Sequence, residues 1–222
     1  MSIFHGHSFP VWSVKFSPLG QYFVSGSNDR TAKLWQTKQH IPLRIFAGHL
    51  SDIDCVEFHP NIHYLATGSN DKQVRLWSIL TGECVRIMVS VAGTVRSLKF
   101  SRSGNHLFSG NEYGQIVVFD VVKGQPLEVV QTCQLKAIWS MDISWDDQVL
   151  AVGTEDGTIE LYNFPKMLAS AGKVLSAQET QQRGKGLSLS PSFMKVFKTK
   201  ASGVLFTKFT WRNFLYTVGN YN

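Results

Sequence analysis

The segment YFVSGSNDRTAKLW at residues 22–35 is followed by YLATGSNDKQVRLW at residues 64–77, so that equivalent residues lie 42 positions apart. The same step separates a Gly-His pair, an aspartate and a Leu-Trp pair, found at Gly6-His7 and Gly48-His49, at Asp29 and Asp71, and at Leu34-Trp35 and Leu76-Trp77. Three landmarks with one shared spacing indicate an internal repeat. A repeat of this length predicts a fold built from one supersecondary unit that is used several times.

Further copies of the unit follow along the chain. A third contains VRSLKFS (95–101) and IVVFD (116–120), and a fourth contains IWSMDIS (138–144) and AVGTEDGTIELY (151–162). The segment VLFTKF (204–209) repeats only the first half of the unit. Within each unit, short apolar runs alternate with turn signals such as SPLG, SND and EDG, which is the pattern of short antiparallel strands.

In the first unit these runs predict four strands, near residues 11–16, 22–26, 31–35 and 42–46. A unit of 42 residues with Gly-His near one end and Leu-Trp near the other resembles the WD-repeat β-propeller, in which each unit forms a four-stranded blade. We therefore expect a single all-β domain over residues 1–222, with four blades and a partial fifth. The expected repeats are 5–47, 48–89, 90–131, 132–198 with a loop insertion at 166–192, and a partial repeat at 199–222.

The recurring polar residues predict a buried hydrogen-bond network in each of the first two units. In the first unit it consists of His7, Ser25, Asp29 and Trp35. The second unit repeats it with His49, Thr67, Asp71 and Trp77. Such groups are tolerated in a core because each satisfies the others, and an orphaned member costs about 1–3 kcal/mol.

His, Ser and Asp are also the residues of a hydrolase triad, so an enzyme is the rival interpretation of the same pattern. The set recurs at the repeat step and includes a tryptophan donor. The chain has no G-x-S-x-G, P-loop or H-E-x-x-H motif. We therefore expect a non-catalytic protein that needs no cofactor and holds no metal.

The third and fourth units have lost part of this network. Ser90-Val91 replaces Gly-His and Tyr113 replaces the aspartate in the third unit, which leaves Ser109 without an obvious partner. The fourth unit keeps Asp156 but has Val152 in the hydroxyl position and no aligned histidine. We expect these two blades to depend on apolar packing alone.

Composition and cysteine usage exclude other classes. With 43% apolar and 17% charged residues, the chain is neither disordered nor coiled-coil in type. It has no apolar run long enough to span a membrane, and its first residues do not resemble a secretion signal. Three cysteines without a C-x-x-C pair fit small apolar residues in a reducing compartment better than disulfides or a zinc site.

The net charge of +6 is confined to one part of the chain. Residues 1–165 contain 13 Lys or Arg and 15 Asp or Glu, whereas residues 166–222 contain 9 and 1. A basic segment of this kind is more often a solvated loop or strand edge than a surface that reads bases. Salt-sensitive phosphate contact with nucleic acid by residues 166–222 is the alternative.

Two parts of the chain resemble a narrower family. PLRIFAGHL (42–50) and FHPN (58–61), with YLATGS after them, look like the middle repeats of subunit 5 of the general transcription factor TFIID and of its paralogue in SAGA-type coactivators. The final segment FKTKASGVLFTKFTWRNFLYTVGNY (197–221) resembles the family's terminal segment, which closes the propeller.

This resemblance implies a scaffold subunit in RNA polymerase II transcription initiation, placed in the nucleus and docked against histone-fold subunits. The resemblance implies an amino-terminal helical region that is followed by a seven-bladed propeller. This chain begins in what would be about the third blade of that propeller. A fragment, a short isoform and a divergent paralogue all fit that difference. In such a ring, Ile3-Phe4 would supply an outer strand for the last blade.

Propellers bind partners mainly at the rim of the central channel, where inner strands begin. The aligned rim position predicts five partner-binding residues, namely Trp12, Asp54, Arg96, Trp139 and Leu205. Arg30 and Lys72, beside the turn aspartates, extend the prediction. For the rim tryptophans, the rival interpretation is packing against the neighbouring blade. For Arg30 and Lys72, it is a solvated charge in a turn. A generic adaptor, such as a ubiquitin-ligase substrate receptor or a signalling scaffold, is the alternative function.

Overall fold

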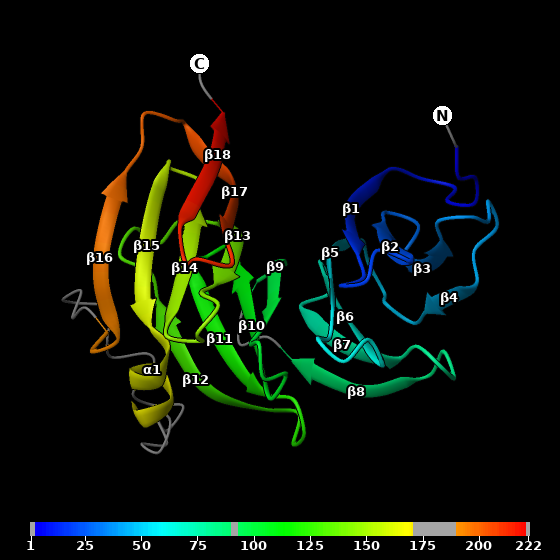
Figure 1. Ribbon diagram of the computed structural model, residues 1–222, viewed down its shortest axis with the longest axis horizontal. Coiled ribbons are helices and arrows are strands. Elements are labelled where there is room, and N and C mark those ends of the chain that lie inside the picture. The colour runs from blue at the N-terminus through cyan, green and yellow to red at the C-terminus, as the bar shows by residue number, and fades with distance from the viewer. Residues whose placement is uncertain (1–2, 90–92, 171–189, 221–222) are drawn as a thin grey trace.

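The computed structural model describes residues 3–89, 93–170 and 190–220, and it is an arc of antiparallel sheets (Figure 1). Four sheets have four strands each, and the last described sheet has two. Every sheet runs in simple meander order from an inner strand to an outer one. The prediction of an all-β fold with four four-stranded blades and a partial fifth is confirmed.

The strand bounds follow the sequence pattern closely. Blade one contains β1 (Val11–Phe16), β2 (Tyr22–Ser27), β3 (Thr31–Gln36) and β4 (Arg44–Ala47). Blade two contains β5 (Ile53–Phe58), β6 (Tyr64–Ser69), β7 (Gln73–Ser78) and β8 (Cys84–Val89). Blade three contains β9 (Val95–Phe100), β10 (His106–Asn111), β11 (Gln115–Asp120) and β12 (Gln125–Gln131). Blade four contains β13 (Ile138–Ile143), β14 (Val149–Thr154), β15 (Thr158–Asn163) and β16 (Phe193–Lys198), and the partial blade contains β17 (Gly203–Phe209) and β18 (Leu215–Asn220).

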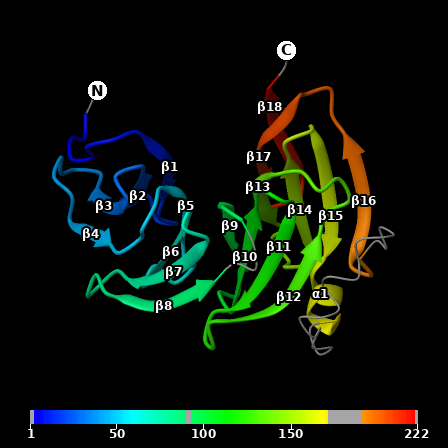
Figure 2. The same cartoon turned by 180° about the vertical axis from the view of Figure 1, so that it is seen from behind.

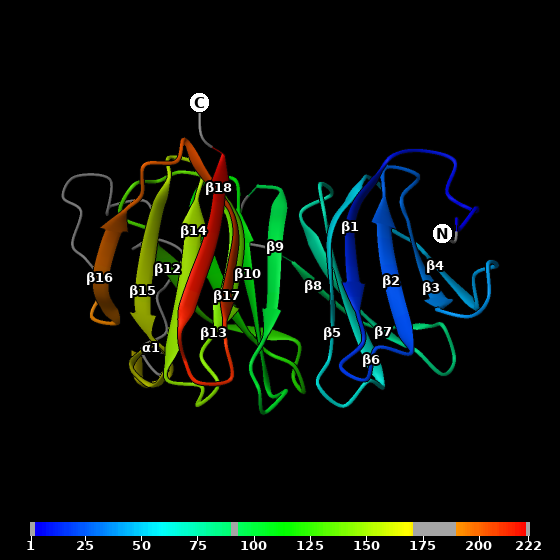
Figure 3. The ribbon, with the colours of Figure 1, turned by 45° about the horizontal axis from the view of Figure 1, so that its top comes forward.

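The inner strands β1, β5, β9, β13 and β17 contact one another in that order (Figure 3). The outer strands β8, β12 and β16 follow the convex edge of the arc, as the view from behind also shows (Figure 2). This arrangement brings equivalent residues of successive repeats close together along the concave side.

The core lies between neighbouring blades, and its residues come from both blades of each pair. Val24, Leu34 and Phe46 of blade one pack with Ile53 and Val56 of blade two. Equivalent clusters fill the spaces between blades two and three and between blades three and four. Each blade therefore buries its apolar surface against the next, which is how repeat units form a continuous core.

One glycine in each complete blade makes this close packing possible. A Cβ atom on Gly26 would lie 2.8 Å from Ile53 Cγ2, and one on Gly110 would lie 2.6 Å from Ile138 Cγ2. Gly68 and Gly153 meet Val95 and Val204 of their following blades in the same way. The second strand of each complete blade therefore carries a glycine against which an apolar residue near the start of the next inner strand packs. We name this position the glycine seat.

The insertion between the third and fourth strands of blade four was predicted as a loop over 166–192, and its first part is helical instead. Helix α1 (Phe164–Ser170) begins where Asn163 Oδ1 accepts the Lys166 backbone N–H at 2.9 Å, which is an N-terminal cap. Phe164 and Met167 are buried against blade three, and this burial stabilises the short helix. Residues 171–189 of the predicted loop lie outside the described residues, and residues 190–192 lead into β16 without being part of a helix or strand.

The expectation that Ile3-Phe4 forms an outer strand of the last blade is wrong. Neither residue lies in a strand, and β17 and β18 form a two-stranded sheet. The Phe4 ring instead lies 5.8 Å from the Trp35 ring, much as Phe46 of β4 lies 5.7 Å from the Trp77 ring. Phe4 thus occupies, on blade one, the place that an outer-strand phenylalanine occupies on blade two.

Among the described residues, no helix is long and apolar enough to cross a membrane. The same residues include no group of three or more His, Cys, Asp or Glu side chains arranged to hold a metal ion.

Candidate functional site

The first candidate site is the network of His7, Ser25, Asp29 and Trp35. His7 Nδ1 lies 2.7 Å from Asp29 Oδ2, His7 Nε2 lies 2.6 Å from Ser25 Oγ, and Trp35 Nε1 donates to the same Oγ at 2.8 Å. Since Asp29 can only accept, Nδ1 carries the imidazole proton and the Ser25 hydroxyl donates to Nε2. The chain of donors therefore ends on the carboxylate with every member satisfied.

Blade two repeats this geometry. His49 Nδ1 lies 2.8 Å from Asp71 Oδ2, His49 Nε2 lies 2.7 Å from Thr67 Oγ1, and Trp77 Nε1 donates to Thr67 at 2.9 Å. Each network connects four parts of its blade: the loop that leads into the blade, the second strand, the following turn and the third strand. Because Ser25 and Thr67 are buried and already hold a tryptophan donor, neither hydroxyl is placed to attack a substrate.

The electrostatics of the network agree with a structural role. Burial raises the pKa of Asp29, but hydrogen bonds from Thr31 and His7 outweigh it and lower that pKa to about 2. The pKa of Asp71 is lowered for the same kind of reason, since hydrogen bonds from Leu50 and His49 outweigh its burial. Burial lowers the pKa of His49 against the pull of Asp71, which favours the neutral imidazole that Thr67 requires.

Blades three and four depart from the network in different ways. In blade three, the buried Ser109 hydroxyl has no hydrogen-bond partner among the described residues. Tyr113 lies in the turn, and its backbone N–H donates to Asn111 Oδ1 at 3.0 Å. The Ser90-Val91 replacement lies outside the described residues. These contacts agree with the loss of the histidine network in blade three, but the expectation of apolar packing alone is wrong there, because the buried Lys99 pairs with Glu57 and Asp142.

For blade four, the expectation of apolar packing alone is wrong. Val152 is buried as expected, but the wholly buried Glu160 accepts the Tyr162 hydroxyl and the Cys133 backbone N–H, the latter at 3.1 Å. Asp156 caps its turn through Thr154 and Thr158. Blade four thus has its own polar network, which depends on a glutamate in the slot that holds Lys33 in blade one.

The second candidate site is the rim of the channel. The five aligned rim residues share one backbone feature, because each is the unpaired residue of a β-bulge in its inner strand: Trp12, Asp54, Arg96, Trp139 and Leu205. A bulge bends a strand and turns its extra side chain away from the ladder. The repeat therefore places a variable side chain at the same point of every inner strand.

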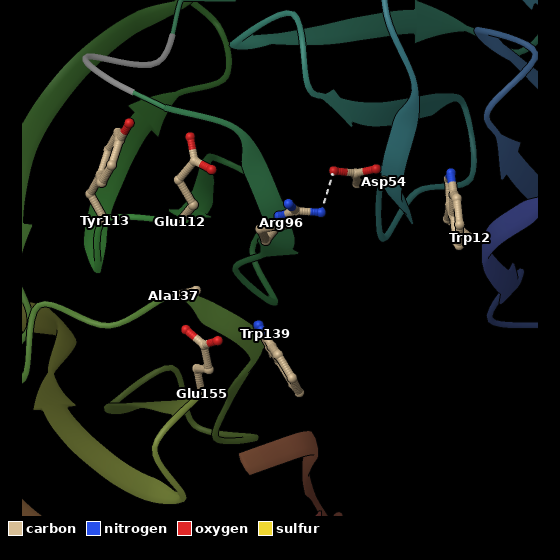
Figure 4. A pocket seen from close by; sticks show the side chains of 8 residues that line it. All are labelled: Trp12, Asp54, Arg96, Glu112, Tyr113, Ala137, Trp139 and Glu155. Atoms are coloured by element: carbon tan, nitrogen blue, oxygen red, sulfur yellow. Dashed lines mark hydrogen bonds and ion pairs between the residues drawn. The ribbon is translucent and has the colours of Figure 1, made fainter. Parts of the chain in front are cut away.

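Four of these five residues meet at one open pocket of about 550 Å³, shown in Figure 4. Trp12, Asp54, Arg96 and Trp139 line it, together with Glu112, Tyr113, Ala137 and Glu155. We call this set of eight residues the rim pocket. Leu205 is exposed but does not line it, so the structure does not bring the fifth predicted residue to the others.

The rim pocket combines aromatic surface with negative charge. Arg96 Nη1 lies 3.0 Å from Asp54 Oδ2, as the dashed line in Figure 4 marks. Glu112 accepts the Thr94 backbone N–H at 3.0 Å, and Glu155 is exposed. Burial raises the pKa of Asp54 even though Arg96 opposes it. One guanidinium among three carboxylates leaves the pocket acidic, and Trp12, Tyr113 and Trp139 are exposed beside it.

The sequence reasoning missed Glu112 and Glu155, although a signal for them existed. Each directly follows the second strand of its blade, where Asn28 and Asn70 stand in the first two repeats. An alignment of the turn residues places Asn28, Asn70, Glu112 and Glu155 at one position.

Arg30 and Lys72 do not line the rim pocket. Both are exposed and have left-handed backbones, with φ of 65° and 67°, at the turn where blades three and four have Gly114 and Gly157. Arg30 lines a smaller hollow with Phe9 and Leu50. This geometry favours solvated turn charges for Arg30 and Lys72 over a role as part of the rim.

A family described as "WD domain, G-beta repeat" matches residues 1–36, 40–78, 82–120 and 125–163. These matches cover most of the chain, and the fold and its repeated network are those of a repeat scaffold. The chain therefore belongs to the WD40 repeat family. A comparison with curated proteins gives no match.

The family unit is offset from the structural blade. The match at 40–78 contains β4 of blade one and then β5, β6 and β7 of blade two. The last three matched units therefore each span two blades, whereas the first, residues 1–36, contains only β1, β2 and β3 of blade one. WD40 repeats form protein-interaction scaffolds, and this general function applies to the chain.

Proposed function

We propose that the chain is a non-catalytic scaffold that captures a protein partner at the rim pocket. The observation that carries this proposal is the convergence of four bulge residues on one acidic, aromatic-rich pocket. Tryptophan and arginine dominate binding energy when an interface desolvates them, and three carboxylates favour a cationic segment of the partner. The histidine networks are not proposed as partner-binding sites, because their side chains form hydrogen bonds with one another inside the blade.

We further propose that the scaffold is a subunit of a TFIID-like or SAGA-like complex in the nucleus, where it docks against histone-fold subunits during transcription initiation. This finer proposal is supported by the resemblance of residues 42–50, 58–61 and 197–221 to subunit 5 of TFIID and its paralogue.

The test is affinity purification of the tagged chain, followed by identification of the copurifying chains. Trp12→Ala and Arg96→Glu are expected to reduce recovery of the main partner at least tenfold without changing the melting temperature. Trp211→Ala is the matched control, because Trp211 is also an exposed tryptophan but lies outside the rim pocket. Equal losses for Trp12→Ala and Trp211→Ala would remove the rim pocket from the proposal.

The identity of the recovered chains separates the finer proposals. Histone-fold subunits support a TFIID-like or SAGA-like complex, whereas ligase or kinase subunits without transcription factors support a generic adaptor. Nucleic-acid binding by residues 166–222 is tested with Lys195, Lys198 and Lys200 changed to glutamate. Retention on DNA that is unchanged by these substitutions would remove that alternative.

A further inference from the structure

A polar contact connects the turn after the second strand of a blade to the loop that leads into the next blade. Asn28 Nδ2 donates to Asp52 Oδ2 at 2.8 Å, between blades one and two. Between blades two and three, Thr94 Oγ1 donates to Asn70 Oδ1 at 2.7 Å. The two asparagines are 42 residues apart, as are their two partners, so the contact belongs to the repeat. We name it the turn joint.

Blades three and four do not form the turn joint, because both of its members have changed. Glu112 and Glu155 replace the asparagines, and the partner positions in the following blades are taken by Ala137 and Gly203. Neither of these small residues has a polar side chain. Each of the two changed joints lies between blades that the structure describes.

The backbone shows that these positions are equivalent. In each complete blade, the N–H of the turn residue donates to the carbonyl of the residue two places before the bulge. These bonds are 2.9 to 3.2 Å long and run from Asn28 to Pro10, from Asn70 to Asp52, from Glu112 to Thr94 and from Glu155 to Ala137. The change therefore affects the side chains of the turn joint and leaves its backbone as it was.

The two carboxylates that replace the asparagines carry negative charge without a cation. Glu112 Oε1 accepts the Thr94 backbone N–H at 3.0 Å, and the Glu155 side chain is exposed. Among the described residues, no ion pair includes Glu112 or Glu155. Lys136, which precedes Ala137, is exposed and does not neutralise them. Both carboxylates are therefore available to a cation from outside.

The opposite part of the rim pocket has no such charge to offer. Asp54 Oδ2 already holds Arg96 Nη1 at 3.0 Å, which makes this pair neutral as a whole. Because both carboxylates of the changed joints line the same pocket, its excess negative charge belongs to Glu112 and Glu155.

An aromatic ring stands beside each of these carboxylates, with Tyr113 next to Glu112 and Trp139 next to Glu155 (Figure 4). Both rings are exposed. A Cβ on Gly203 would lie 3.3 Å from Trp139 Cζ3, so the small residue in the changed joint gives this ring its place. The loss of the turn joint thus exposes two acids and makes room for an aromatic surface.

An arginine side chain matches this combination of groups better than a lysine. A guanidinium offers five N–H donors to carboxylates, is more weakly hydrated than an ammonium group and stacks on aromatic rings. A lysine ammonium is a compact charge that holds its water more strongly.

We propose that Glu112, Tyr113, Trp139 and Glu155 bind an arginine side chain of the partner, and we name these four residues the arginine corner. The inference rests on the proposed capture of a partner at the rim pocket, and it specifies which chemical group of the partner the pocket recognises. The carboxylates supply the charge, and the rings supply the stacking surface.

The first experiment uses N-acetyl-arginine methylamide as the probe. The tryptophan indole N–H signals of the labelled chain are followed by NMR during titration, and Trp139→Phe identifies the signal of Trp139. We expect this signal to shift with arginine, and the lysine analogue to bind at least about threefold more weakly. Equal affinities for the two probes, or no shift with arginine, would overturn the proposal.

The carboxylates are tested one at a time. Glu112→Gln and Glu155→Gln are each expected to weaken arginine binding about threefold, as befits partly exposed ion pairs. Glu83→Gln is the matched control, because Glu83 is also an exposed glutamate but lies outside the rim pocket. Equal effects of all three substitutions would show a general attraction to negative charge and would overturn the arginine corner.

A second test rebuilds the turn joint. Glu112→Asn combined with Ala137→Thr gives the turn of blade three the same pair as Asn70 and Thr94. We expect this double variant to melt at a higher temperature than Glu112→Asn alone, because the joint is regained, and still to bind arginine weakly. A double variant that binds arginine as tightly as the original chain would contradict the proposal.

Partner purification separates this inference from the proposed function. Recovery that falls with Trp12→Ala but not with Glu112→Gln plus Glu155→Gln would overturn the arginine corner and leave capture at the rim pocket in place. Recovery that none of these substitutions changes, together with specific arginine binding in the titration, would overturn the proposed capture while the corner itself stands.

Discussion

Lys99 reaches Glu57 of the preceding blade at 3.0 Å and Asp142 of the following blade at 2.9 Å, so one ammonium group connects three successive blades. Burial lowers the pKa of Lys99, but Glu57 and Asp142 outweigh that effect and raise it above its ordinary value. The protonated form is therefore held through the physiological range. On the concave side of the arc, ion pairs connect neighbouring blades in addition to the apolar cores between them.

Removing Lys99 is expected to be strongly destabilising. Lys99→Met removes the cation that the buried carboxylates of Glu57 and Asp142 share, a change that costs about 3–5 kcal/mol. Urea unfolding followed by circular dichroism measures the loss. Lys15→Met is the matched control, and because Lys15 is partly exposed, its loss is expected to stay under about 1 kcal/mol. Similar losses for both variants would contradict the pairing described for Lys99.

The aspartates of the two histidine networks predict a second stability effect. Asp29→Ala and Asp71→Ala each orphan a histidine, with a loss of about 1–3 kcal/mol. Tyr113→Ala removes the residue that replaces this aspartate in blade three and is expected to have a milder effect, since no network depends on its side chain. Melting temperatures of the three variants test this ranking, and equal shifts at all three positions would refute it.

Stability is expected to fall with acid in two windows. The folded pKa of His49 lies below its ordinary value of 6.5, so the unfolded chain takes up this proton first and stability falls as the pH drops below about 6.5. The folded pKa of Asp29 is about 2 against 3.8, so its contribution is present above about pH 4 and is lost as the pH falls toward 2. Urea unfolding at a series of pH values measures both windows. The variant Asp29→Asn should flatten the lower window, and an unchanged slope there would exclude Asp29 as its source.

The glycine seat predicts a pair of coupled substitutions. Gly110→Ala places a Cβ 2.6 Å from Ile138 Cγ2, and such overpacking costs about 1–3 kcal/mol. Ile138→Ala removes Cγ2, the atom in that 2.6 Å contact, so the double variant should be more stable than the sum of the two single effects predicts. A double-mutant cycle by urea unfolding measures this coupling. Strict additivity would show that the two residues do not limit each other.

The amino-acid sequence by itself determined the unit of this fold, because a step of 42 residues aligned apolar strands, turn residues and the polar network. The pairing of His7 with Asp29 could be predicted because both residues recur at the repeat step, as His49 and Asp71. The position of Trp12 and its equivalents at the start of the inner strands could be predicted for the same reason. These features depend on local periodicity, which a single sequence carries.

Only the tertiary structure decided which side chains meet across blades. Glu160 became the centre of a polar network because β15 and the segment at Cys133 come together, and no repeat pattern marks that contact. Leu205 and Trp139 share a backbone position, yet only Trp139 lines the rim pocket. The curvature of the arc and the burial of each inner strand by its neighbour determine such contacts. They arise between residues distant in sequence, where the pattern of a single repeat carries no information.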